Sequence, residues 1–296
     1  MHSAVDSPYL VPFDGSFQIK DARTRPPKDV PPKGKLRKQR VALTDSLREL
    51  QLKLYGGDRH SLLIIFQALD AAGKDGTIRA VMSGVNPAGC QVSSFQRPSK
   101  EELDHDFLWR TACRLPRRGN IGIFNRSYYE EVLVVRVHPD LLAAQRVRIP
   151  KDPDQIWDWR IKAIRDHEEH LARQGTVVVK FFLHVSADEQ KNRLLKRIED
   201  PDRNWKFDAN DVSERKHRAA YLRAYEAALQ SSSRPWAPWY AIPADNKPFM
   251  RVQVADILVR TLERINPAFP TVSDARRAEL LSFRESLLAE GEDLGD

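Results

Sequence analysis

The stretch that decides the fold is LLIIFQALDAAGKDGTI, which runs from Leu62 to Ile78. Its first five residues, Leu62 to Phe66, form a continuous apolar run, which is typical of a strand buried on both faces of a parallel sheet. A loop containing Gly73 follows, and a helix is expected from about Gly76 to Met82. A strand, a glycine-containing loop and a helix in this order form the setting of a phosphate-binding loop.

The loop itself carries the groups that such a site needs. Lys74 supplies a mobile cation, and the loop backbone offers donors at Ala71, Ala72, Gly73, Asp75, Gly76 and Thr77. The sequence departs twice from the Walker pattern G-x-x-x-x-G-K-[S/T]. Ala68 stands in place of the first glycine, and Asp75 stands in place of the serine or threonine. Because no hydroxyl follows Lys74, we expect Asp70 to hold Mg²⁺ or to position the acceptor. An ordinary glycine-rich turn is the alternative.

Further apolar runs alternate with helical segments along the whole chain. Strands are expected at residues 92–95, 121–124, 177–185 and 239–243, and helices at 36–57, 99–115, 154–173, 186–199, 211–229, 251–264 and 274–288. This alternation predicts an α/β fold, a parallel sheet with helices on both faces and additional terminal helices. We expect an irregular basic arm over residues 1–34, a catalytic domain over 35–270, and a terminal helix and tail over 271–296.

Composition excludes several classes of protein. The chain has 296 residues, 41% hydrophobic and 30% charged, which is enough to fill a sizeable core. Its two cysteines, Cys90 and Cys113, argue against a disulfide framework and a structural zinc site. No apolar run approaches the roughly 18 residues of a membrane span, and no secretory signal is visible. We therefore expect a cytoplasmic protein without a membrane partner.

The basic residues are concentrated in one segment. Nine basic and two acidic residues lie between Lys20 and Arg40, and this difference equals the whole net charge of +7. Such a segment favours a polyanionic partner, because it attracts phosphates and releases counter-ions. A solvated arm is the alternative.

A second motif, GIFNRSYYEEV, follows the strand that ends near Phe124. In phosphate-loop enzymes the neighbouring strand often delivers a carboxylate to the metal, and Asn125 stands at that place here. Arg126 can make bidentate contacts with phosphate. Tyr129 can stack on a base or pack within the fold. Glu130 fits a metal, an arginine or an acceptor hydroxyl, although an exposed helical charge needs no such role.

The third motif is a basic run from Gln190 to Phe207, in which Asp200-Pro201 breaks the helix. Arg193 and Arg197 are four residues apart and share one helix face. A basic helix ending in a break suits a lid over about residues 190–212, since a lid must reach the transferring group and exclude water. A solvated charged helix is the alternative. The cations of this run are Arg193, Lys196, Arg197, Arg203 and Lys206.

Together the motifs LDAAGKDGTI, FNRSYYE, EDPDRNWKF and APWYAIPADNK resemble the polyphosphate kinase 2 family, from about residue 36 to 267. The resemblance implies a P-loop-kinase-like fold and phosphoryl transfer from inorganic polyphosphate to nucleotides, with Mg²⁺ or Mn²⁺. It implies that Asp70 positions the metal and the attacking phosphate, that Lys74 and Arg126 bind phosphates, and that Arg193 and Arg197 are lid arginines.

Two positions depart from the ADP-specific members of that family, which carry Asp in place of Asn125 and Asn in place of Glu130. The sequence looks like the short subgroup that accepts AMP as well as ADP. The expected metal residues are Asp70, Asn125 and Glu130.

A polyphosphate donor needs a channel lined with cations, and the candidates are Lys74, Arg79, Arg97, Arg114, Arg117, Arg118 and Arg126. The expected partners are polyphosphate, adenine nucleotides, with guanine nucleotides left open, and further copies of this chain in a dimer or tetramer. Two other functions compete. One is an ATP-dependent nucleoside monophosphate kinase, and the other is a non-catalytic nucleic-acid-binding protein, which the absence of an RNA-binding motif disfavours.

Overall fold

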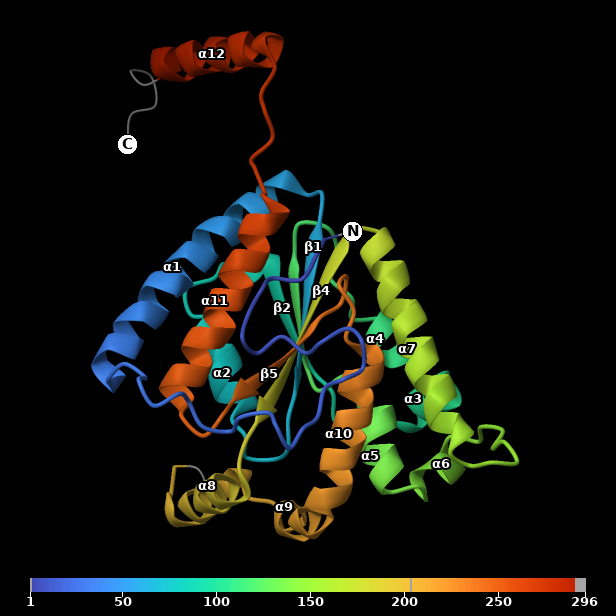
Figure 1. Ribbon diagram of the computed structural model, residues 1–296. Helices are drawn as coiled ribbons and strands as arrows, with labels where there is room; N and C mark the ends of the chain where they lie inside the picture. The colour runs from blue at the N-terminus through green and yellow to red at the C-terminus, as the bar shows by residue number, and fades with distance from the viewer. Residues whose placement is uncertain (1, 203, 291–296) are drawn as a thin grey trace.

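The computed structural model describes residues 2–202 and 204–290. Within them one parallel sheet has the strand order β2-β3-β1-β4-β5 (Figure 1). The central strand β1 is buried at every residue because β3 and β4 flank it and helices cover both faces of the sheet, which is why Leu62–Phe66 is a continuous apolar run. The predicted parallel α/β sheet is therefore confirmed. The strands are β1 (Ser61–Gln67), β2 (Cys90–Ser94), β3 (Ile121–Asn125), β4 (Thr176–His184) and β5 (Trp239–Pro243).

Two layers of helices cover the sheet (Figure 1). On one face α1 (Lys33–Gly57) packs along α11 (Lys247–Ile265), which also contacts the short α2 (Lys74–Val81). On the other face α5 (Glu130–Val137), α7 (Gln155–Arg173) and α10 (Arg218–Ser232) contact one another. The sheet therefore lies in the middle of three layers, and the loops after its strands meet at one edge.

The segments that cross this carboxyl edge are short. After β4 come α8 (Ala187–Glu199), the 3₁₀ turn Asn204–Lys206 and α9 (Ala209–Glu214), and α8 and α9 lie at the bottom of Figure 1. The remaining short elements are α3 (Lys100–Asp104), α4 (Trp109–Ala112), α6 (Leu141–Ala144) and the 3₁₀ turn Pro87–Gly89.

Two predicted helices are interrupted. The helix expected at residues 99–115 breaks into α3 and α4 because His105 is extended and the Asp106 carboxylate accepts a hydrogen bond from the Leu108 amide. The helix expected at 211–229 is divided by the 3₁₀ turn Arg215–His217. The predicted caps are present, since Ser99 forms a capping box with Glu102 and the Ser186 hydroxyl accepts from the Glu189 amide.

The N-terminal segment is irregular but packs on the body. The Val11 amide donates to Trp239 O at 2.9 Å and the Ala241 amide donates to Tyr9 O at 2.8 Å, so this segment extends the sheet at β5. Val5 and Val11 are buried in the main core. The segment preceding Lys33 therefore contributes to folding as well as to charge.

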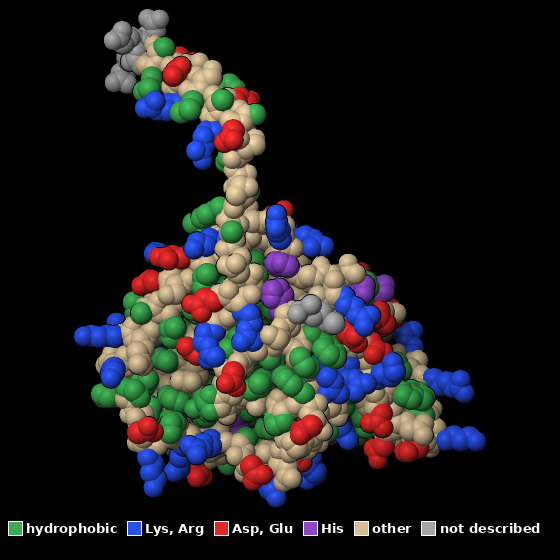
Figure 2. All heavy atoms as spheres, turned by 45° about the horizontal axis from the view of Figure 1, so that its top comes forward, with side chains coloured by type: hydrophobic (Ala, Val, Ile, Leu, Met, Phe, Trp, Pro, Cys, Tyr) green, Lys and Arg blue, Asp and Glu red, His purple; other side chains and the backbone are tan. Residues whose placement is uncertain are grey.

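The last helix, α12 (Asp274–Ala289), stands apart from the body (Figures 1 and 2). None of its residues is buried, and it exposes Leu280, Leu281, Phe283, Leu287 and Leu288. Its length and polarity do not fit a bilayer, and neither do those of any other helix in the described part of the chain.

Candidate active site

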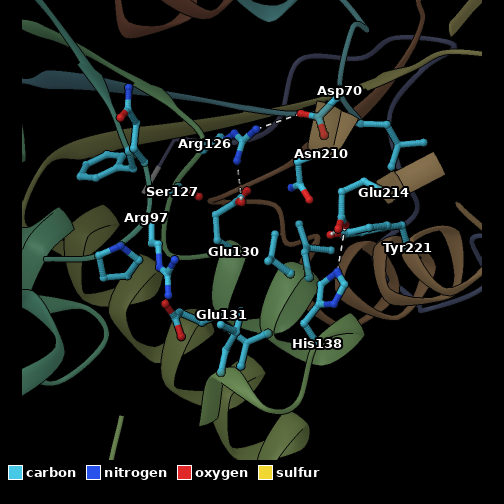
Figure 3. A pocket seen from close by; sticks show the side chains of 18 of the residues that line it. Asp70, Arg97, Arg126, Ser127, Glu130, Glu131, His138, Asn210, Glu214 and Tyr221 are labelled. Carbon is cyan, nitrogen blue, oxygen red and sulfur yellow. Dashed lines mark hydrogen bonds and ion pairs between the residues drawn. The ribbon is translucent and has the colours of Figure 1, made fainter. Parts of the chain in front are cut away.

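A cavity of about 840 Å³ opens where the loops after β1, β2 and β3 meet α5, α9 and α10. Asp70 enters from the loop after β1, Arg97 from the loop after β2, and Arg126 from the loop after β3 (Figure 3). The carboxyl edge of a parallel α/β sheet is where ligands bind in such folds. The predicted motifs therefore converge on one pocket.

The loop after β1 has the backbone of a phosphate cradle. Ala71 and Gly73 have positive φ angles of 60° and 106°, which turn the chain sharply into α2. The Lys74 ammonium donates to Ala68 O at 2.8 Å and so bridges the two ends of the loop. Burial lowers the pKa of Lys74, and the charge of Arg126 acts in the same direction. An anion bound beside it would favour the charged lysine.

Arg126 joins this loop to the next one. Its Nη2 donates to Asp70 Oδ1 at 2.9 Å, and its Nη1 lies 3.6 Å from Glu130 Oε2 (Figure 3). Glu130 also accepts from the Gln67 amide at 2.9 Å, at the end of β1. The charge of Glu130 raises the pKa of Arg126; burial opposes it, and the charge of Asp70 adds a smaller effect in the same direction as Glu130. The charged form is thus favoured, and two acids and one base form a connected group at the cavity wall.

Asn125 offers one further oxygen. Its Nδ2 donates to Asp75 Oδ1 at 2.8 Å, while its buried Oδ1 has no hydrogen-bond partner among the described residues. An unpartnered amide oxygen suits a hard cation such as Mg²⁺, which prefers oxygen ligands. The residues present therefore fit a divalent ion.

The comparison with known proteins identifies the family at this point. The family model described as Polyphosphate kinase 2 matches residues 32–270. The chain belongs to the polyphosphate kinase 2 family. A member of this family is a polyphosphate-dependent nucleotide phosphotransferase, and the predicted enzyme class is confirmed.

Two relatives and one solved structure match this polyphosphate kinase 2 over most of its length. It is 52% identical over 245 residues to the ADP-polyphosphate phosphotransferase of Rhodopseudomonas palustris, covering 82% of this chain and 85% of the relative. It is 45% identical over 230 residues to the AMP/ADP-polyphosphate phosphotransferase of Meiothermus ruber, covering 78% and 82%. The crystal structure of polyphosphate kinase 2 from Arthrobacter aurescens TC1 matches with a TM-score of 0.81 and 32% identity, covering 95% and 99%. The predicted P-loop-kinase-like fold is thereby confirmed.

Arg193 of this polyphosphate kinase 2 does not project from a lid. Its buried guanidinium donates to Ala72 O at 2.6 Å and also to Ala244 O, while its Nε donates to Glu189 at 2.7 Å. It fastens α8 to the backbone of the phosphate loop. Carbonyl and carboxylate oxygens surround its guanidinium here, and the role of Arg193 as a lid arginine stays a prediction.

Arg197 is one turn further along α8, and its Nη1 lies 2.6 Å from Asp211 Oδ2 in α9. This ion pair links the two helices of the predicted lid across residues 190–212. The side chain of Lys206 and the whole of Arg203 lie outside the described residues, so both stay predictions.

Tyr129 lies in the core and not in the cavity. Its side chain is buried, and its hydroxyl lies 3.0 Å from Glu168 Oε1 and 2.8 Å from Ser232 Oγ. The prediction that Tyr129 stacks on a base is therefore wrong, because neighbouring side chains fill the space around its ring.

The residues predicted to line the donor channel lie at two opposite edges of the sheet. Arg97 lines the cavity, whereas Arg117 and Arg118 precede β3 and Arg118 donates to Arg59 O, just before β1. Arg114 is exposed between α4 and the start of β3. In a parallel sheet these positions lie at the amino edge, away from the phosphate loop. The prediction that Arg117 and Arg118 line the same channel as Lys74 is wrong, and Arg114 belongs to the segment that leads to them.

A second group of cations lies along α2, where Arg40 donates to Ala80 O at 2.7 Å near the end of the helix. Arg251 Nη2 lies against Gly76, where an added Cβ would be 3.2 Å from it. Burial, and then the charges of Arg40, Arg79 and Arg193, lower the pKa of Arg251. Of these, sequence reasoning found Arg79 and Arg193. It placed Arg40 only in the basic segment expected to attract a polyanion and missed Arg251, although the helical register of α11 could have directed Arg251 toward α2.

Proposed function

We propose that this polyphosphate kinase 2 transfers the terminal phosphoryl group of inorganic polyphosphate to ADP and to AMP, reversibly. The observation that carries the proposal is the junction of Asp70, Lys74 and Arg126 at the mouth of a cavity large enough for a nucleotide. The names of the relatives from Rhodopseudomonas palustris and Meiothermus ruber support ADP and AMP as acceptors.

The lining of the cavity is chemically mixed. It includes apolar side chains suited to a nucleoside base, namely Phe107, Leu133, Val134 and Leu141. It also includes Asp70, Arg126 and Glu130, which belong to the loops after β1 and β3 and the start of α5. We propose that a nucleotide places its phosphates against these charged groups and its base against the apolar side chains, which agrees with the usual apolar pocket with a few polar groups that fix orientation.

Transfer between two phosphates requires mainly positioning and neutralisation of charge. Lys74 and Arg126 bring two cations to the transferring group, and Arg126 adds two parallel donors. Asp70 orients Arg126 and faces the acceptor. The attacking group is itself a phosphate oxygen, which is ionised at neutral pH, so no general base is required.

A divalent ion, Mg²⁺ or Mn²⁺, would be held by Asp70 and the Asn125 oxygen, with Glu130 within reach of the same group. Among the described residues no three acidic, histidine or cysteine side chains gather into a complete site. This agrees with the way Mg²⁺ uses one or two carboxylates and takes its remaining ligands from substrate phosphates and water. When bound, the ion supplies positive charge to the phosphates.

For the donor we propose a track along α2, formed by Lys74 and Arg251 near its start and by Arg79 and Arg40 near its end, where Arg40 donates to Ala80 O at 2.7 Å. These cations interact with one another, since the charges of Arg40, Arg79 and Arg193 add to burial in lowering the pKa of Arg251. Such mutual repulsion is relieved by a polyanion. This track takes the place of the channel predicted from Arg114, Arg117 and Arg118, which lie toward the opposite edge of the sheet.

The test is a nucleotide panel with polyphosphate as the sole donor and no ATP added. We expect ATP from ADP and ADP from AMP. An ATP-dependent monophosphate kinase forms no ADP from AMP without ATP, and any ATP that it makes by disproportionating two ADP does not depend on polyphosphate, so omitting polyphosphate separates the competing enzyme. A gel-shift assay with nucleic acid tests the non-catalytic alternative, and the guanine nucleotides of the panel test the breadth of the acceptor site.

The oligomeric state and the cellular location stay predictions. We propose a dimer or tetramer, as the sequence suggests, and light scattering on the full chain measures it.

A further inference from the structure

A buried ionic cluster lies behind the active site, and the chemistry above makes no use of it. The Lys180 side chain is 0% exposed and Glu168 is 1% exposed, and Lys180 Nζ lies 2.5 Å from Glu168 Oε2. Lys180 comes from the second strand from the sheet edge, β4, and Glu168 comes from α7. Sequence reasoning assigned no role to either residue.

Two tyrosines converge on the same carboxylate. The hydroxyls of Tyr128 and Tyr129 each lie 3.0 Å from Glu168 Oε1. The Tyr129 hydroxyl also accepts from Lys180 Nζ at 2.9 Å, and Lys180 donates to Ser232 O in α10 at 2.9 Å. The cluster thus connects the loop after β3 with β4, α7 and α10.

The tyrosines stand between two residues of the active site. Arg126 precedes them with a φ of 64°, a left-handed conformation that is unfavourable for arginine, and Glu130 follows them at the start of α5. Strained backbone of this kind persists only where the surroundings fix it. On one side the Arg126 amide donates to Phe66 O at 3.0 Å. On the other side the fixing contacts are those of Tyr128 and Tyr129.

We propose that Glu168 is a positioning residue for phosphoryl transfer. Through its hydrogen bonds with Tyr128 and Tyr129 it fixes the positions of Arg126 and Glu130 relative to each other. This inference rests on the proposed function, since it assigns a reaction to the Arg126 site. Glu168 does not reach the cavity itself. It acts through a rigid link of two aromatic rings, whose buried hydroxyls share its carboxylate.

The composition of the cluster supports positioning over simple stabilisation. A buried ion pair is often no more stabilising than apolar side chains of similar volume, because both charges lose their hydration. An apolar cluster would stabilise the core equally well, yet it could not accept hydrogen bonds from two tyrosine hydroxyls at one atom. The carboxylate therefore specifies where the tyrosine rings stand, and so where the backbone on either side of them runs.

The experiment compares Tyr128→Phe and Glu168→Gln with the matched control Tyr240→Phe. Tyr240 is also fully buried and donates to Val5 O at 2.7 Å, but it lies on β5, away from the Arg126 loop. The melting temperature, kcat and the nucleotide KM of each full-length variant are measured with polyphosphate as donor. Tyr128→Phe removes a single hydroxyl and carries the test if Glu168→Gln does not fold.

We expect Tyr128→Phe and Glu168→Gln to lower kcat at least fivefold with the nucleotide KM within twofold, while Tyr240→Phe lowers only the melting temperature. A kcat within twofold of wild type in Tyr128→Phe overturns the inference, whether or not KM changes. A failure of the proposed function is distinguishable, because the wild-type enzyme would then form no product from polyphosphate.

Discussion

Asp70 and Arg126 are 56 residues apart in the sequence, yet the carboxylate of one accepts a hydrogen bond from the guanidinium of the other at 2.9 Å. The pair connects the loops that follow two adjacent strands, β1 and β3. Because the connection exists in the fold itself, charged groups of the site are in place before a substrate arrives. Preorganised charge of this kind is the main source of electrostatic catalysis.

Replacing Lys74 tests the phosphate loop. Lys74→Met should leave the melting temperature nearly unchanged, because the ammonium makes one hydrogen bond to Ala68 O. It should remove nearly all transfer, about 100-fold or more, since the loop itself holds no second cation in the sequence. The measurement is ATP formation from ADP and polyphosphate. Activity within threefold of wild type in a normally folded protein would contradict the role of Lys74.

Asp70→Asn tests whether the carboxylate positions the reacting groups. The amide oxygen can still accept from Arg126, so the fold should survive while the negative charge is lost. We expect turnover to disappear. The control is a titration with Mg²⁺ and Mn²⁺, and full recovery of kcat at high metal concentration would reduce Asp70 to a weak metal ligand without a positioning role.

Glu130→Asn tests the choice of acceptor. AMP is one phosphate shorter than ADP, and a carboxylate near the acceptor can hold an ion or water that fills the gap. Glu130 is fixed by Gln67 and Arg126 at the wall of the cavity. We expect kcat/KM for AMP to fall at least about tenfold, or about 1.4 kcal/mol, with a smaller change for ADP. Equal losses for both acceptors would mean that Glu130 is not selective.

The donor track predicts different effects at the two edges of the sheet. Arg251→Ala should raise the KM for polyphosphate several-fold, whereas the matched control Arg118→Ala should leave it unchanged. The polyphosphate KM should also rise more steeply with salt than the nucleotide KM, because more charges are paired. Equal salt slopes, or a larger effect from Arg118→Ala, would refute the track around α2.

The buried His184 makes the free energy of unfolding depend on pH below neutrality. Burial, and then the charge of Arg218, lower the pKa of His184 from 6.5 to about 4. Between these values the unfolded chain binds a proton that the native state does not, so the free energy of unfolding falls as the pH drops, by about 3 kcal/mol over the window. Chemical denaturation from pH 7 to 4 measures this, and His184→Gln should flatten the dependence. An unchanged slope in that variant would assign the effect to other groups.

The fold could be predicted because its strands are unusually clear in the sequence. The run Leu62–Phe66 is apolar throughout and the strand at 177–185 is apolar except for Lys180 and His184, and the central β1 and its neighbour β4 need such residues. The convergence of Asp70 and Arg126 also follows from the sequence, because adjacent parallel strands deliver their next loops to the same edge. These predictions depend only on local pattern and sheet direction.

The remaining site residues depend on tertiary packing, which the sequence does not display. Arg118 and Arg97 are both basic residues of loops, and only the course of the chain places them at opposite edges. Tyr129 could have faced either the cavity or the core, and the buried Glu168 decides between them. Gln67 ends an apolar strand without any motif that marks its contact with Glu130.

The cations around the phosphate loop already have protein partners, because Lys74 contacts a carbonyl, Arg126 contacts two carboxylates and Arg193 is surrounded by backbone oxygens. A single chloride or acetate ion can replace only one of these contacts at a time and gains little. A chain of phosphates can replace several in one event. We therefore expect the number of charges on one molecule to favour polyphosphate over small single anions at this site.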